Sequence, residues 1–508
     1  MTTADAASTP ARPAPAALAG GVGGAAALAP LVAAVLEALR DGAVQRGGPL
    51  PAGGPDAVAA GLAGLLDPAA LLPEHGDPDA LRLLTEALAA TAADPADPAC
   101  AAHLLPPPLA VAVAADLAVA AVNPSLDSWD QAPGSTSVEL SVLRTLAGLV
   151  GFPEAATGVF TAGGTESNLT ALLLARDALP REQFATGRLT VHCSAAAHFS
   201  VARAAMVLGL GADAVVPVDT APDGRMDPRV LDWALADARA EGRTPIAVVA
   251  TAGTTDLGAV DPLRTVAAIT RRHGVRLHVD AAYGGGALFS RRLAPLLDGI
   301  GLADTISLDL HKLGWQPVAA GVLLARDPAL LAPLEQRAAY LNPADDEEAG
   351  YTSLLGRSLR TTRRPDAFKV AVTLRTLGRA GLGGLVDRCH GLARYAAARI
   401  AAEPRLELTA EPVLTTVLFR YLPADGDASD AVNAALRRRL LAQGRAVVGR
   451  TALADGSVRL KFTLLNPHTT EADVDRLLQL VLAAAEATEA ATTATTAEAD
   501  VADEATEA

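Results

Sequence analysis

The chain has 508 residues, of which 50% are hydrophobic and only 3% aromatic, and its formal net charge at pH 7 is −15. This length predicts two or three domains with a large buried core. The acidic balance argues against binding nucleic acid through a basic face, and the apolar runs at residues 25–36 and 109–122 are too short or too interrupted to span a membrane.

Three cysteines, Cys100, Cys193 and Cys389, are far apart in the sequence and lack the spacing of metal ligands. They predict neither a disulfide framework nor a zinc site. No convincing signal peptide precedes the first apolar run. Together these features predict a metal-free protein of the reducing cytoplasm.

The two ends of the chain have unusual compositions. Residues 1–24 are mostly Ala, Pro, Thr and Gly, and residues 487–508 alternate Ala, Thr and acidic residues, so both are expected to be disordered. Broken helical patterns at 25–105 predict an arm that packs on another surface, such as a partner subunit. We expect a large domain at 106–375 and a smaller C-terminal domain at 376–486.

A helical run at 109–122 leads into a loop, residues 123–133, that contains Trp129 and the acidic residues Asp127 and Asp130. A tryptophan among acidic residues is typical of a pocket wall, since binding residues concentrate on loops. A well-packed turn explains the same composition equally well, so both interpretations stay open.

A glycine pair, Gly163 and Gly164, precedes Thr165 and Ser167 at the start of a predicted helix over 169–177. Free backbone N–H groups at a helix start attract an anion, and the helix dipole adds to the attraction. Phosphate binding is one interpretation of this pattern. Ordinary capping by Thr165 and Ser167 is the other.

Short apolar strands alternate with helices through the middle of the chain, which is the signature of a mostly parallel sheet covered on both faces. In such sheets, ligands bind at the carboxyl ends of the strands. The alternating segments are residues 189–192, 199–208, 214–218, 228–240, 246–250, 263–273 and 277–280.

Informative polar residues stand at three of these strand ends. Asp280 carries the sharpest signal, because a carboxylate at the end of an apolar strand is costly unless it faces a cation or several donors. Ala282 and the glycines at 284–286 leave room for a flat ligand beside it. His198 is either a structural histidine or a residue that stacks on such a ligand, and Thr254 follows the third strand.

Residues 307–312 end a further run of β-formers in a polar cluster that contains Lys312. A lysine at the mouth of a buried strand loses hydration, so its neutral amine becomes more accessible and can condense with an aldehyde. A surface lysine is the common alternative. Pyridoxal phosphate carries a phosphate, a flat ring, a pyridine nitrogen and an aldehyde, which suit the glycine pair, His198, Asp280 and Lys312 in turn.

On these residues, the chain resembles the group II pyridoxal-phosphate-dependent amino-acid decarboxylases. The resemblance implies an α/β protein of fold type I, with a mostly parallel sheet in the large domain and a smaller C-terminal α+β domain. It also implies pyridoxal 5'-phosphate as the cofactor and a homodimer with the active site at the subunit interface. It runs from His103 to about residue 470 and rests on residues 123–131, 160–168, 197–200, 249–255, 278–283, 311–312 and 360–369.

The resemblance implies a role for each matching residue. Lys312 bonds to the cofactor aldehyde, and Asp280 pairs with the pyridine nitrogen. His198 stacks on the ring, with Ala282 on the opposite face. Thr254 lies near the phenolic oxygen or the substrate carboxylate. The expected phosphate contacts are Gly164, Thr165 and His311.

Tyr340 matches a tyrosine on a mobile loop that closes over the active site, often across the dimer interface, and helps to protonate the carbanion. Three positions depart from the family pattern. Asp309 lies near the position at which the relatives have an asparagine, and Leu313 occupies a position at which they have an aromatic residue. Lys461 stands where some relatives have an arginine for the substrate carboxylate, and lysine supplies only a point charge.

The implied activity is decarboxylation of an L-amino acid to an amine and carbon dioxide. The chain looks closest to the branch acting on L-2,4-diaminobutyrate and lysine. A second ammonium on the substrate needs a carboxylate, and Asp130 beside Trp129 is the first candidate. Alternatives are an aromatic amino-acid or glutamate decarboxylase, an aminotransferase, and an inactive binding homologue.

Overall fold

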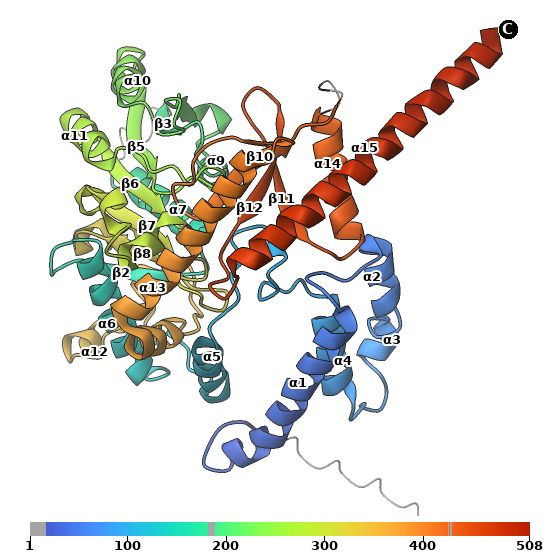
Figure 1. Ribbon diagram of the computed structural model, residues 1–508. Helices are drawn as coiled ribbons and strands as arrows, with labels where there is room; N and C mark the ends of the chain where they lie inside the picture. Colours follow the sequence, from blue (N-terminus) through green and yellow to red (C-terminus); the bar gives the residue numbers. More distant parts are fainter. Residues whose placement is uncertain (1–16, 181–187, 425, 427–428, 508) are drawn as a thin grey trace, which may run out of the picture.

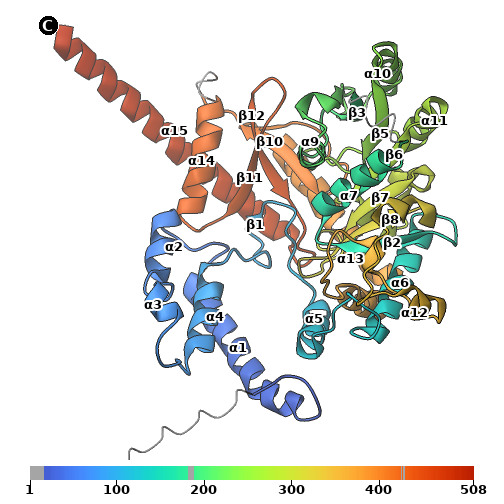
Figure 2. The same ribbon diagram turned by 180° about the vertical axis from the view of Figure 1, so that it is seen from behind.

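The computed structural model describes residues 17–180, 188–424, 426 and 429–507. A helical arm, a large α/β domain and a small domain follow one another along most of the chain (Figure 1). The arm comprises α1 (Gly24–Arg46), α2 (Gly54–Leu62), α3 (Pro68–Leu71) and α4 (Ala80–Thr91). It lies beside the small domain, where Gly53 N donates a 2.8 Å hydrogen bond to Ala442 O (Figure 2).

The large domain is built around a seven-stranded sheet of order β2-β8-β7-β6-β5-β3-β4. Only β8 runs in the opposite direction to the other six strands, so the predicted mostly parallel sheet is confirmed. The strands are β2 (Thr157–Thr161), β3 (Leu189–Ser194), β4 (Val215–Val218), β5 (Thr244–Thr251), β6 (Arg276–Ala281), β7 (Thr305–Asp309) and β8 (Gly321–Ala325).

Helices cover both faces of this sheet, as its apolar strands require. Along β5, Val248 and Ala250 face a core shared with α6, α10 and α11, whereas Ala247 and Val249 face a core shared with α7 and α9. The helices are α5 (Ala110–Val122), α6 (Pro133–Leu149), α7 (Gly164–Asp177), α9 (Ser200–Val207), α10 (Pro228–Ala240), α11 (Leu263–His273) and α12 (Ala344–Glu348).

The small domain contains a five-stranded sheet of order β1-β11-β12-β10-β9. Its strands and helices are β9 (Leu406–Leu408), β10 (Thr416–Tyr421), α14 (Ser429–Ala442), β11 (Val447–Ala452), β12 (Val458–Thr463) and α15 (Glu471–Glu507). The edge strand β1 (Cys100–Ala101) comes from the segment predicted as a helical arm and pairs in parallel with β11. Two residues are too few for a sequence pattern to identify such a strand.

Two predicted boundaries, at 375–376 and at 486–487, fall within long helices. Helix α13 (Ala367–Ala402) crosses the expected division at 375–376, with a break at Gly378, whose φ is 62°. Residues 487–507, expected to be disordered, continue the backbone of α15 (Figure 1). Alanine, the best helix former, recurs through this segment. Of the other expected tail, residues 1–16 lie outside the described residues, as does Ala508.

Candidate active site

A cavity of about 690 Å³ opens where the parallel strands of the large sheet end. Three neighbouring strands place polar residues in register there, because Thr251 of β5 is paired with Asp280 of β6, and Asp280 with Ser307 of β7. This cavity is lined by most of the residues that the sequence predicted for the site, namely Gly164, Thr165, His198, Asp280, Ala282, His311 and Lys312.

The glycine pair forms one wall of the cavity at the start of α7. A Cβ atom on Gly164 would lie only 2.8 Å from the Cβ of Ala282, so glycine is needed for this close approach. No side chain caps α7, and its 14 residues place a helix dipole behind the cavity wall. The geometry therefore favours the anion-binding interpretation over ordinary capping.

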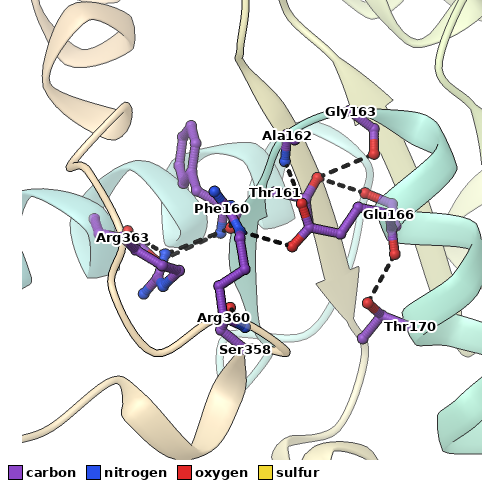
Figure 3. Close-up of polar contacts among 11 residues, drawn as sticks. Phe160, Thr161, Ala162, Gly163, Glu166, Thr170, Ser358, Arg360 and Arg363 are labelled. Carbon is purple, nitrogen blue, oxygen red and sulfur yellow. Dashed lines mark hydrogen bonds and ion pairs between the residues drawn. The ribbon is translucent and has the colours of Figure 1, made fainter. Parts of the chain in front are cut away.

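Charged residues hold the glycine loop from behind (Figure 3). Glu166 accepts hydrogen bonds from Ala162 N at 2.6 Å and from Arg360 Nε at 3.0 Å, and Arg360 Nη2 also donates to Phe160 O. Arg363 forms a buried pair with Glu139, in which burial raises the pKa of Glu139. Through these contacts, the segment after Ser358 fixes the positions of the end of β2 and of the loop before α7.

Asp280 is 94% buried and held by three donors. Asn168 Nδ2 donates to Oδ2 at 2.8 Å, while Ser307 Oγ and Ala282 N donate to Oδ1 at 3.3 and 3.1 Å. Asn168 Oδ1 in turn lies 2.9 Å from Nε2 of His278. Burial lowers the pKa of His278 to about 4, so its neutral ring donates to Asn168 and fixes the orientation of that amide.

His198 is joined to the same network. Ser200 N donates to His198 Nδ1 at 3.3 Å, and Ser200 Oγ lies 2.9 Å from the same nitrogen. Asn168 Nδ2 donates to that hydroxyl at 2.9 Å. Burial lowers the pKa of His198, so the imidazole is a neutral ring at the cavity wall near pH 7.

Lys312 reaches the cavity from the turn after β7. Its Nζ lies 3.1 Å from Asp309 Oδ2, and Nε2 of His311 lies 3.5 Å from the same oxygen. His311 Nδ1 accepts a hydrogen bond from Ala320 N, and burial lowers the pKa of this histidine. Lys312 is therefore the charged partner of Asp309.

The other predicted residues lie outside the cavity lining. Thr254 is buried and accepts a hydrogen bond from Ala259 N, whereas its neighbour Thr255 lines the cavity. Lys461 Nζ lies 2.8 Å from Asp256 Oδ1, and the side chain of Tyr340 is 84% exposed.

Trp129 and Asp130, which were predicted to contact the substrate, also lie outside the cavity lining. Trp129 packs edge to face on Tyr351. Asp130 is exposed and accepts a hydrogen bond from Ser128 Oγ. For these residues, as for Tyr340 and Lys461, the roles implied by the resemblance stay predictions.

Several lining residues received no individual role from the sequence: Glu166, Asn168, Thr251 and Asp309. Asn168 had a usable signal, because a residue four positions after Gly164 in a helix lies on the same face. Glu166 gave no such signal, because its charged partner, Arg360, is 194 positions away.

The residues at the cavity fit pyridoxal phosphate. Free N–H groups at a helix start suit its phosphate, a buried carboxylate suits its pyridine nitrogen, and an accessible lysine amine suits its aldehyde. Thr251 Oγ1 and Asp309 Oδ1 are buried polar atoms without hydrogen-bond partners in the described structure, so the lining can still bind a polar ligand. Within the described ranges, no group of three or more acidic, histidine or cysteine side chains could hold a metal ion.

Residues 80–422 match the family described as Pyridoxal-dependent decarboxylase conserved domain. The chain is 45% identical over 426 residues to an L-2,4-diaminobutyrate decarboxylase from Rhizobium meliloti (strain 1021), covering 83% of this chain and 85% of the relative. An L-2,4-diaminobutyrate decarboxylase from Acinetobacter baumannii is 39% identical over 408 residues, or 76% of this chain and 79% of the relative.

A solved structure from Vibrio parahaemolyticus has the same fold. It is the glutamate decarboxylase domain of diaminobutyrate-pyruvate transaminase and L-2,4-diaminobutyrate decarboxylase, with a TM-score of 0.80 and 35% identity. The match covers 92% of this chain and 97% of that one. With the family match, the confirmed fold and a cavity that fits the cofactor, the chain belongs to the pyridoxal-dependent decarboxylase family.

Proposed function

We propose that this pyridoxal-phosphate-dependent carboxy-lyase removes the α-carboxylate of an L-amino acid that carries a second amino group. L-2,4-Diaminobutyrate is the first candidate and lysine the second. The observation that carries the proposal is the 45% identity to the Rhizobium meliloti enzyme across most of both chains.

The charges of the cavity support a cationic side chain on the substrate. The lining contains the carboxylates of Glu166, Asp280 and Asp309, and no arginine among the residues that the structure describes. A glutamate substrate carries a side-chain carboxylate that needs a cation, and Lys312 is the one lysine in that lining. Opposite charges favour binding, so a diamino acid suits this cavity better than an acidic one.

The cavity residues hold the cofactor in this proposal. Lys312 would hold it through the aldehyde, and Asp280 would pair with its pyridine nitrogen. The bound cofactor supplies the electron sink for the electron pair that the departing carboxylate leaves behind. Asn168 and Ser307 keep the carboxylate of Asp280 oriented toward the cavity wall, so that its charge is placed before the reaction begins.

Six further residues surround the cofactor in this proposal. The neutral ring of His198 covers one face of the site. On the opposite side, the small side chain of Ala282 leaves room for the cofactor ring to approach closely. The N–H groups of Gly164 and Thr165, with the ring of His311, hold the phosphate. Thr254 keeps its predicted role near the phenolic oxygen or the substrate carboxylate, and its two neighbours, Gly253 and Thr255, line the cavity.

Two residues outside the lining act on the substrate in this proposal. Tyr340 delivers the proton to the α-carbon after its loop closes over the site. Lys461 leaves Asp256 to bind the α-carboxylate. The proton must reach the α-carbon, because protonation at the aldehyde position would lead to transamination.

We also propose that the chain acts as a homodimer, with the active site at the subunit interface, in the cytoplasm. Exposed apolar side chains recur along the arm and α5, and large exposed apolar surfaces mark interaction sites. They include Leu31, Leu36, Leu39, Val44, Leu84, Leu88, Val113, Leu117 and Val122. Light scattering at micromolar concentration tests the dimer, and a monomer would contradict it.

Carbon dioxide release from a panel of amino acids tests the activity. The panel contains L-2,4-diaminobutyrate, lysine, glutamate, tyrosine and tryptophan, and kcat/KM is compared among them. We expect the highest value for L-2,4-diaminobutyrate. Higher values for tyrosine or tryptophan than for either diamino acid would assign the chain to the aromatic branch.

Borohydride reduction of the loaded enzyme, followed by peptide mapping, tests Lys312 separately. We expect the label on the peptide that contains Lys312 and none in Lys312→Ala. A label on Lys369 or Lys461 in the wild type would show that the cofactor lysine is wrongly assigned.

A further inference from the structure

An ion pair between the large and small domains lies beside the cavity lining. Lys461 Nζ of β12 lies 2.8 Å from Asp256 Oδ1, and Thr451 Oγ1 donates to Asp256 Oδ2 at 2.9 Å. Asp256 directly follows Thr255, which is an exposed residue of the cavity lining. The side chain of Asp256 is itself 39% exposed, so a small ligand can reach its carboxylate.

A tight turn after β5 holds Asp256 in this place. Gly258 N donates to Thr254 O at 2.9 Å, and Asp256 lies in the middle of the turn that this bond closes. A Cβ atom on Gly258 would lie 3.2 Å from the Cβ of Leu414, so the turn packs closely against the chain that leads into β10. The position of Asp256 relative to the small sheet is therefore fixed.

Lys461 lies near the cavity lining on a second side. Strand β1 pairs with β11, and Gly449, the next residue of β11, is paired with Lys461. The chain after β1 continues through His103 into Leu104, which lines the cavity. Burial and the charges of Arg437 and Lys461 lower the pKa of His103, which agrees with this placement.

The proposed function leaves Asp256 without its cation. When Lys461 moves to the α-carboxylate of the substrate, Asp256 Oδ1 loses its partner, and only the hydroxyl of Thr451 still donates to this carboxylate. Separating an ion pair costs free energy unless each charge finds a new partner. A substrate with a second ammonium carries the replacement cation itself.

The carboxylates of the cavity lining are committed to other partners. Asp280 is held by three donors and faces the proposed pyridine nitrogen, and Glu166 is paired with Arg360. Asp309 packs closely against the glycine pair that is proposed to hold the phosphate. Asp256 is the nearby carboxylate that binding of the substrate itself sets free.

We propose that Asp256 binds the side-chain ammonium of the substrate in exchange for Lys461, and thereby sets the preference for diamino acids. This inference rests on the proposed function and deepens it. A neutral side chain leaves Asp256 unpaired, and the side-chain carboxylate of glutamate is repelled by it. Asp130, the candidate from the sequence, is exposed and bonded to Ser128, and it is the rival.

The test compares the binding of two amines that differ in one ammonium group. The product expected from L-2,4-diaminobutyrate is 1,3-diaminopropane, and n-propylamine lacks its second amino group. Calorimetry gives the dissociation constant of each amine for the holoenzyme of the wild type, Asp256→Asn, Lys461→Met and Asp130→Asn. The cofactor content of each protein is measured by absorbance first.

We expect the two variants of the ion pair to change diamine binding in opposite directions. Asp256→Asn should weaken 1,3-diaminopropane binding about threefold to tenfold, because the carboxylate is lost and Lys461 then repels the ammonium. Lys461→Met should strengthen it, because the ammonium no longer competes with Lys461 for Asp256. The affinity for n-propylamine should change less than about twofold in both variants.

Kinetics with two amino acids gives a second measurement. In L-norvaline, a methyl group replaces the side-chain ammonium of L-2,4-diaminobutyrate. The ratio of kcat/KM for the diamino acid to that for L-norvaline should fall in Asp256→Asn. Release of Lys461 helps both substrates to bind, whereas only the diamino acid loses a contact.

Three results would overturn the inference. Weaker diamine binding in both Asp256→Asn and Lys461→Met, or equal changes for both amines, would show that the pair only joins the domains. A selective loss of diamine binding in Asp130→Asn alone would transfer the role to Asp130. Absence of carbon dioxide release from any diamino acid by the wild type would instead refute the proposed function, and the inference with it.

Discussion

Asn168 Nδ2 donates a 2.8 Å hydrogen bond to Asp280 Oδ2 and so joins the first turns of α7 to the end of β6. The phosphate cradle proposed at Gly164 and the proposed pyridine partner are therefore parts of one hydrogen-bonded unit. Asn168 also binds Ser200, which contacts His198. One amide thus positions the carboxylate and, through Ser200, the imidazole of the cavity.

Replacing Asn168 tests this positioning. In Asn168→Ala, Asp280 Oδ2 and His278 lose their partner, and an unpaired buried polar group costs about 1–3 kcal/mol. We expect kcat to fall about 10- to 100-fold with cofactor at saturation. Thr170→Ala is the control, since Thr170 is buried on the same helix and its hydroxyl, among the residues that the structure describes, donates only to Glu166 O. Equal kcat losses in both variants would indicate a general effect of α7.

Replacing the carboxylate itself should have a larger effect. If Asp280 pairs with the pyridine nitrogen as proposed, Asp280→Asn removes the charge that keeps this nitrogen protonated, and removal of one such stabilising group costs about 10²–10³ in kcat. Single-turnover measurements of carbon dioxide release separate this loss from slower product release. A kcat near that of the wild type would mean that Asp280 has a structural role only.

Tyr340 is expected to act from a loop that closes. In this segment, Arg337 lies 3.9 Å from Glu347, and the buried Asn342 bonds to Ala338 N and Gln336 O. We expect trypsin to cleave after Arg337 in the free enzyme and more slowly with 1,3-diaminopropane bound, because closure protects the backbone. Tyr340→Phe should keep this protection and lose about 10²-fold in kcat. Equal cleavage with and without the amine would argue against closure.

Lys461 and Thr451 of the small sheet both bind Asp256 of the large domain. If Lys461 also binds the substrate carboxylate, Lys461→Met should raise KM about tenfold for every amino acid substrate, since the α-carboxylate is common to all. Asp256→Asn should not raise KM, because it releases the ammonium of Lys461. An unchanged KM with a lowered melting temperature in both variants would restrict Lys461 to a contact between domains.

The pH dependence of stability should include a term from His278. Its pKa is about 4 in the folded protein and about 6.5 in an unfolded chain. Between these values the unfolded chain binds a proton that the folded protein does not, so the free energy of unfolding falls as pH falls from 6.5 toward 4.

Urea unfolding at pH 7 and pH 5 measures this term. His278→Gln removes the titrating group, so its free energy of unfolding should fall by about 1–2 kcal/mol less than that of the wild type over this interval. The same cofactor concentration is used throughout. An identical decrease in both proteins would show that His278 is protonated in the folded state as well.

The sequence by itself predicted strands β3 to β7 and the helices between them in the large domain, but not β2 or β8. Continuous apolar strands alternate with amphipathic helices, and this periodicity follows from local burial, which neighbouring residues specify. It also located most of the cavity lining, since parallel strands bring their carboxyl ends to one edge of a sheet. Asp280, His198 and Lys312 were therefore found without coordinates, and the family resemblance named their cofactor.

Only the tertiary structure decided how polar groups choose their partners. Asn168 and Asp280 are 112 positions apart, and Lys461 and Asp256 are 205 positions apart, so no local pattern records either pair. The same holds for β1, whose two residues become a strand only because the edge of β11 lies beside them. Asp309 became informative in the same way, because burial and a missing partner are properties of the folded surroundings and not of the residue type.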